Sequence, residues 1–127
     1  MKHLLFVSFL FSSLNVGASQ LGDVWLVEKL ASSPNISTRL NDELGRKLKV
    51  VSTRKMTLLN DTFNSLKSAS ELNPRFLLIT GDQPNALAGP VDLQPTVAVN
   101  FAMLDLVGYN KDEWAAILGH ELAHLKL

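Results

Sequence analysis

The 127-residue sequence predicts a single domain that combines helices with short strands. Apolar residues recur at helical spacing over residues 36–66. Two short apolar runs, 76–80 and 96–100, are typical of strands, and residues 111–127 have the capping and apolar pattern of a helix. At this length there is no room for a second domain, because one domain takes about 150 residues.

The composition excludes several classes of protein. Lys and Arg number 12 and Asp and Glu number 12, so the charge balance argues against a nucleic-acid binder, which would carry a basic excess. The absence of cysteine excludes a disulfide scaffold, a Cys-based zinc finger and a thiol nucleophile. An apolar content of 46% is too high for a disordered chain.

The first 18 residues have the pattern of a secretory signal peptide. A short basic start is followed by an apolar stretch over residues 4–14 and by small residues at Val16 and Ala18. The stretch is too short for a membrane-spanning helix, which needs about 20 apolar residues. We therefore expect cleavage after Ala18 and an exported chain, periplasmic or secreted, whose residues 19–127 carry no transmembrane anchor. The alternative is a buried N-terminal helix.

The first half of the mature chain is predicted to be helical. Residues 19–30 are amphipathic, and a polar stretch with a proline, 32–35, ends them. A longer helical stripe then runs through Ile36, Leu40, Leu44, Leu48, Val51, Met56, Leu59, Phe63 and Leu66. Asn73 ends this helix because the residue before proline is disfavoured in the α region.

The second half alternates short elements. Residues 83–95 contain three prolines and one glycine and are predicted to be a loop between the two strands. In the strand at 96–100 the two valines share one face. Residues 101–107 are predicted to form a short helix that Gly108 closes.

The last segment is predicted to be a buried helix. Asn110 stands three residues before Glu113, which is the spacing of a capping box that opens a helix at Lys111. One face carries Trp114, Leu118, Leu122 and Leu125, and another carries the small residues Ala115, Ala116, Gly119 and Ala123. A helix that is apolar on most sides is expected in the interior.

This helix contains the one constellation that carries chemistry. His120 and His124 are four residues apart, so both imidazoles lie on one face and can bind one zinc ion. Glu121 lies beside them and could act as general base toward a zinc-activated water. The alternative is a pair of histidines without a metal, but polar groups inside an apolar helix are costly without partners.

Residues 112–124 resemble the active-site helix of the gluzincin metallopeptidases related to the CAAX prenyl protease and the HtpX-like bacterial proteases. The similarity is strongest over residues 73–127 and includes the Asn-Ala-Leu-Ala segment at 85–88. It implies an α+β, mainly helical fold, with a small sheet whose edge strand docks a protein or peptide substrate. It also implies zinc ligation by His120 and His124, Glu121 as catalytic base, and a role in the periplasm.

The chain departs from this family at the third zinc ligand, a glutamate on a downstream helix, because the sequence stops at Leu127. Glu113 lies seven residues before His120, about 10.5 Å along a helix, which is too far to share the ion. The other acids weighed as donors are Glu71, Asp92 and Asp105. We expect a fragment or a truncated gene product that holds zinc weakly and associates through exposed apolar helix faces.

The expected function is that of a zinc-dependent metalloendopeptidase that hydrolyses internal peptide bonds of envelope or secreted proteins. The alternative is a truncated, catalytically inactive remnant that binds peptides.

Overall fold

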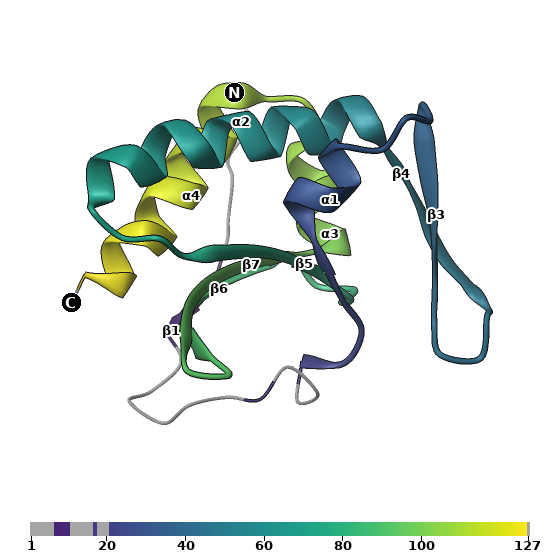
Figure 1. The fold of residues 1–127 in the computed structure, drawn as a ribbon, viewed down its shortest axis with the longest axis horizontal. Coiled ribbons are helices and arrows are strands. Elements are labelled where there is room, and N and C mark those ends of the chain that lie inside the picture. The colour runs from purple at the N-terminus through teal and green to yellow at the C-terminus, as the bar shows by residue number, and fades with distance from the viewer. Residues whose placement is uncertain (1–6, 11–16, 18–20, 127) are drawn as a thin grey trace.

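The computed structural model describes residues 7–10, 17 and 21–126, and Figure 1 shows helices covering one face of a twisted sheet. The described elements are β1 (Val7–Leu10), β2 (Val24–Leu26), α1 (Val27–Ala31), β3 (Ser37–Asn41), β4 (Lys47–Ser52), α2 (Thr53–Ser70), β5 (Arg75–Ile79), β6 (Asn85–Val91), β7 (Gln94–Asn100), α3 (Phe101–Val107) and α4 (Lys111–Leu125). The expected α+β fold is confirmed.

The larger sheet is mixed, with the strand order β1-β6-β7-β5-β2. Its centre is β7, which runs parallel to β5 and antiparallel to β6. The outer strands are β2, antiparallel to β5, and β1, parallel to β6. The two strands predicted from the sequence are confirmed, and each starts one or two residues earlier than expected. The structure also makes them parallel neighbours.

The main core lies between this sheet and the helices. Val97 and Val99 face the helices, whereas Ala98 belongs to a smaller cluster on the opposite face, so the predicted alternation along this strand is confirmed. The largest fully buried core side chains include Trp114, Phe63, Met56, Leu59, Leu78, Met103, Leu104, Ile117 and Leu118. α4 packs against α2, β6 and β7, which fixes the position of the candidate site.

The predicted helical stripe over residues 36–66 is wrong in its first half. Residues 37–52 form a two-stranded antiparallel hairpin, β3 and β4, which stands apart from the larger sheet in Figure 1. The leucines of this half recur every four residues but share no face, because Leu40 is buried on β3, whereas Leu44 in the turn and Leu48 on β4 are exposed. The second half of the stripe is α2, as predicted.

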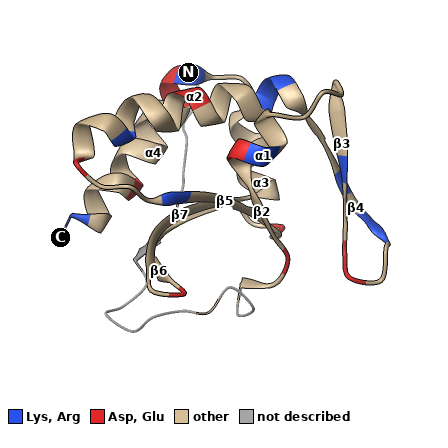
Figure 2. Cartoon of the chain, in the orientation of Figure 1, with Lys and Arg blue, Asp and Glu red and all other residues tan. Residues whose placement is uncertain are grey.

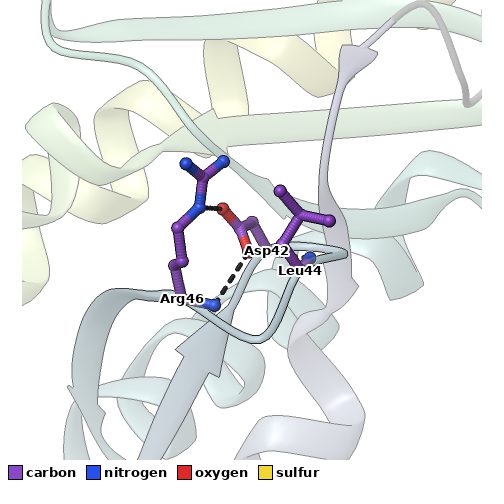
Figure 3. Close-up of polar contacts among 3 residues, drawn as sticks. All are labelled: Asp42, Leu44 and Arg46. Atoms are coloured by element: carbon purple, nitrogen blue, oxygen red, sulfur yellow. Dashed lines mark hydrogen bonds and ion pairs between the residues drawn. The ribbon is translucent and has the colours of Figure 1, made fainter.

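The turn of this hairpin explains why residues 37–52 form two strands rather than a helix. The Asp42 carboxylate accepts the backbone N–H groups of Leu44 (2.9 Å) and Arg46 (2.8 Å), and Arg46 Nε donates to its second oxygen at 2.7 Å (Figure 3). Gly45 has φ +79°, which favours glycine. The hydrogen bond from the Arg46 backbone, together with the Arg46 guanidinium, lowers the pKa of Asp42 below its ordinary value.

This lowered pKa predicts a pH dependence of the hairpin. Because the folded pKa lies below the unfolded one, the turn's contribution to stability is complete above the unfolded pKa and is lost as the pH falls through the folded value. An NMR titration of the Asp42 carboxyl carbon should therefore give a midpoint pH below that of an unstructured aspartate. In the Arg46→Ala variant this midpoint pH should rise. A midpoint pH in the parent chain equal to that of an unstructured aspartate would contradict the prediction.

The predicted loop at 83–95 is also wrong, because β6 and β7 form a hairpin there. Pro90 lies opposite Pro95 near the turn, where missing N–H groups remove few hydrogen bonds from the ladder. Asp92 and Leu93 form the turn with φ of 50° and 68°. The prolines thus mark the end of a hairpin.

The expected N-terminal helix at 19–30 is replaced by β2 and α1, although residues 18–20 lie outside the described part. Val24 and Trp25 belong to types that favour strands, and they pair with β5. Most of the predicted signal peptide, residues 1–18, also lies outside the described part, and residues 7–10 form β1. Among the described helices, none has the length and apolar character needed to cross a membrane.

Candidate metal centre

α4 is held in place by its first turn. Asn110 caps the helix by accepting the backbone N–H of Glu113 at 3.1 Å, so the predicted N-cap is confirmed. The return bond of a capping box is replaced, because the Asn110 Nδ2 donates to the Glu113 carboxylate while the Asn110 backbone N–H donates to the Val107 carbonyl oxygen. One turn on, Trp114 is fully buried, and its indole Nε1–H donates to the Gly108 carbonyl oxygen at 2.8 Å. These contacts fix the rotation of the helix and hence the direction of every later side chain.

The two histidines of this helix converge. His120 Nε2 and His124 Nε2 are 3.0 Å apart, and the ring centroids are 4.6 Å apart with the planes at 85°. Two nitrogens bound tetrahedrally to zinc at 2.0–2.1 Å are separated by about 3.3 Å. A small outward shift of the rings would therefore let both Nε2 atoms bind one ion, and the pair fits zinc as two of its ligands.

Glu121 occupies a different environment from the histidines. Its side chain is fully buried, whereas His120 is exposed and His124 is half-buried. The carboxyl group therefore lies at the inner edge of the motif, shielded from bulk water. His124 Nδ1 is buried and has no hydrogen-bond partner among the described residues.

α4 is buried or half-buried on most sides, as expected, but one side is open. Ala116, His120 and Ala123 form an exposed stripe, because the core contacts use the opposite side with Trp114 and Leu118. The exposed stripe is the side on which the histidines meet, so a substrate could reach the motif from solvent.

Two of the four small residues of α4 face a neighbouring helix. Gly119 and Ala123 line a shallow groove of about 260 Å³ between α2 and α4, opposite Leu66 and Ala69. The expected association through exposed apolar helix faces stays a prediction, and this groove is the face of α4 on which it would be sought.

No third metal donor joins the histidines in the described part of the chain, where no cluster of three or more His, Asp or Glu side chains could hold an ion. Glu113 is engaged in the helix cap, and Asp105 pairs with Lys49 Nζ at 2.8 Å. Glu71 ends α2, and Asp92 lies in the β6–β7 turn. The acids weighed in the sequence therefore do not complete the site.

Comparison with known proteins gives two matches. The sequence model of Peptidase family M48 matches residues 54–127, which include α2, the central strands and the whole of α4. Over 70 residues the chain is 37% identical to a protein described as "Protease HtpX homolog" from Salinibacter ruber. The aligned part covers 54% of this chain and 25% of that relative, so the chain spans about a quarter of its length. No solved structure matches significantly.

Proposed function

The chain belongs to peptidase family M48, a family of zinc metallopeptidases, and on that premise we propose that it acts as a zinc-dependent metalloendopeptidase. The observation that carries the proposal is the convergence of His120 and His124 on the exposed side of α4, next to the buried Glu121. The substrates would be proteins or peptides of the cell envelope or the secreted fraction.

The residues of the motif would divide the work of peptide hydrolysis. His120 and His124 would hold the ion through their Nε2 atoms. When bound, zinc supplies a Lewis acid that polarises the scissile carbonyl and lowers the pKa of a coordinated water toward about 7. Glu121 would accept the proton of the attacking water on its carboxylate and then donate it to the leaving amine nitrogen. Its burial keeps bulk water from competing for that proton.

The ligand roles predict a loss of metal on substitution. His120→Ala and His124→Ala should each lower the zinc retained after dialysis by about tenfold or more, because one imidazole alone is a weak site. Zinc content per chain, measured by atomic absorption, checks this. Glu121→Gln is the matched control on the same helix and should retain as much zinc as the parent. A histidine variant that kept its zinc would contradict the assignment.

The competing function is that of an inactive, peptide-binding remnant, and the observation that favours it is the pair of donors without a third in the described residues. Casein cleavage by the purified chain, with and without a chelator, separates the two functions. Chelator-sensitive cleavage together with bound zinc supports the peptidase. A zinc-free chain that cleaves nothing supports the remnant.

We further propose that the chain is exported and that its signal peptide is cleaved after Ala18. The support is the basic start, the apolar run over residues 4–14 and the small residues at the exit. Mass spectrometry of the periplasmic or secreted fraction should find an N-terminus at Ser19 or within a residue or two. Full-length chain recovered only from the cytoplasm would overturn this proposal. Cleavage would also remove β1 from its place beside β6.

A further inference from the structure

A second candidate site lies away from the histidine motif. A cavity of about 610 Å³ opens between α1, the middle of α2 and the first residues of β5 and β7, and no residue of the His120–His124 motif lines it. Its volume falls in the range of about 300–1,000 Å³ that is usual for ligand sites. We call it the α2–β5 cavity.

The floor of the α2–β5 cavity is aromatic and its rim is rich in amides. Phe63 and Phe76 stack with centroids 4.6 Å apart at the base. Around them stand four side-chain amides, Asn60, Asn64, Asn73 and Gln94. Each side-chain amide has both a hydrogen-bond donor and an acceptor. Such amides can bind the C=O and N–H groups of a peptide backbone.

Basic side chains outnumber acidic ones in the lining. Lys67 and Arg75 both line the cavity, and in the described part of the chain neither forms an ion pair, while Glu28 is the one acid of the lining. Lys67 Nζ lies 5.9 Å from the centroid of the Phe63 ring, above the floor. An adjoining cavity of about 410 Å³ shares Arg75 and adds Lys29. Figure 2 shows these basic positions on α1, on α2 and at the start of β5.

The guanidinium of Arg75 uses only part of its hydrogen-bonding capacity within the described residues. Its Nη2 donates to the Val91 carbonyl oxygen at 2.8 Å, whereas Nε is buried and has no hydrogen-bond partner among the described residues. A buried N–H without an acceptor is costly, and a guanidinium favours a carboxylate. The lining therefore favours an anionic ligand.

The strand edge beside the cavity favours an extended peptide over other anions. β2 pairs with β5 only through Leu77–Ile79, because the chain turns into α1 after Leu26. On that side, Arg75 and Phe76 have no partner strand among the described residues. An extended segment could add to this edge and continue the line of β2, with its backbone paired to β5 and its side chains over the floor and the cations.

From these observations we propose that the α2–β5 cavity binds an extended, acidic peptide segment. The segment lies along the β5 edge, its carboxylates meet Lys67 and Arg75, and its backbone groups face the side-chain amides of the rim. This site is separate from the histidine motif, so the proposal does not depend on the proposed peptidase function.

Fluorescence anisotropy on the Glu121→Gln chain tests the proposal as binding without hydrolysis. The probe is a fluorescein-labelled peptide of alternating Glu and Val, compared with the same peptide carrying Gln for Glu. The acidic peptide should bind about tenfold more tightly, as expected for charge-assisted hydrogen bonds. Lys67→Gln should weaken its binding by about fivefold to tenfold. Lys47→Gln removes the same charge from the exposed β4 strand and should leave binding unchanged.

Two further arms address the fold of the variants and the kind of ligand. Asn64→Glu places an opposing charge at an exposed rim position and should also weaken binding while the circular dichroism spectrum stays that of the parent. A peptide N-methylated at alternate residues should bind poorly, because it cannot pair with a strand edge. Oligogalacturonate, a polyanion without peptide groups, should bind poorly for the same reason.

Four results would each overturn the proposal. They are equal affinity for the Glu and Gln peptides, unchanged binding by Lys67→Gln, equal binding of the N-methylated peptide, and equal binding of oligogalacturonate.

Discussion

Replacing Glu121 by Gln should lower the rate of peptide-bond hydrolysis by about 10²–10⁴-fold while zinc remains bound, because general base catalysis contributes on that scale. The amide has the shape of the carboxylate but cannot take the proton of the attacking water. The amide also keeps the volume of the fully buried side chain, so the packing of α4 should be preserved. The measurements are kcat on a quenched fluorescent peptide and zinc content per chain.

Glu113→Gln provides the matched control for this experiment. It makes the same chemical change on the same helix, and the amide oxygen can still accept the hydrogen bond from Asn110. Its rate should stay within about twofold of the parent, since it changes only the half-buried cap at the far end of the helix from the motif. A Glu121→Gln variant as fast as the parent would show that another group is the base.

Trp114→Ala should lower the free energy of unfolding by about 3–5 kcal/mol, the usual cost of truncating a buried aromatic side chain. The indole has no exposed surface, and its loss also leaves the Gly108 carbonyl without the Nε1–H donor at 2.8 Å. Urea unfolding followed by circular dichroism gives the change. Because α4 carries the motif, zinc retention should fall together with the stability.

Tyr109→Ala is the comparison variant, because this aromatic residue lies close to Trp114 in the sequence but is 52% exposed. It should cost about 1 kcal/mol or less. Trp114→Phe keeps most of the apolar volume and should fall between the two, which preserves the test if the alanine variant does not fold. A loss below about 1 kcal/mol for Trp114→Ala would contradict the packing described here.

The elements that could be predicted from the sequence are those whose boundaries depend on interactions between residues close together in the chain. Asn110 and Glu113 define the start of α4, and Gly108 ends α3, because capping depends on residues within one turn. The alternation around Val97 identified a strand with two buried faces. The hairpin at 37–52 was missed because Leu40, Leu44 and Leu48 recur at helical spacing, although they lie on two strands and the turn between them.

In the candidate site, too, the sequence predicts what local geometry decides but not what depends on packing. The four-residue spacing correctly predicts that His120 and His124 meet, since any helix would bring them together. Whether the motif faces solvent or the core depends on which side of α4 the sheet covers, and the sequence did not reveal that. The α2–β5 cavity was also missed, because Lys67 and Arg75 become neighbours only when α2 packs over the start of β5.

The strand order also determines when this chain can fold as it is synthesised. β7 lies at the centre of the larger sheet, yet it is the last of the sheet's strands to be made. Until it emerges, β5 and β6 lack their common neighbour, and β2 must wait for β5 through the whole of the hairpin and α2. Pairing between such distant segments is slow. The larger sheet of the nascent chain therefore stays incomplete until β7 has been made.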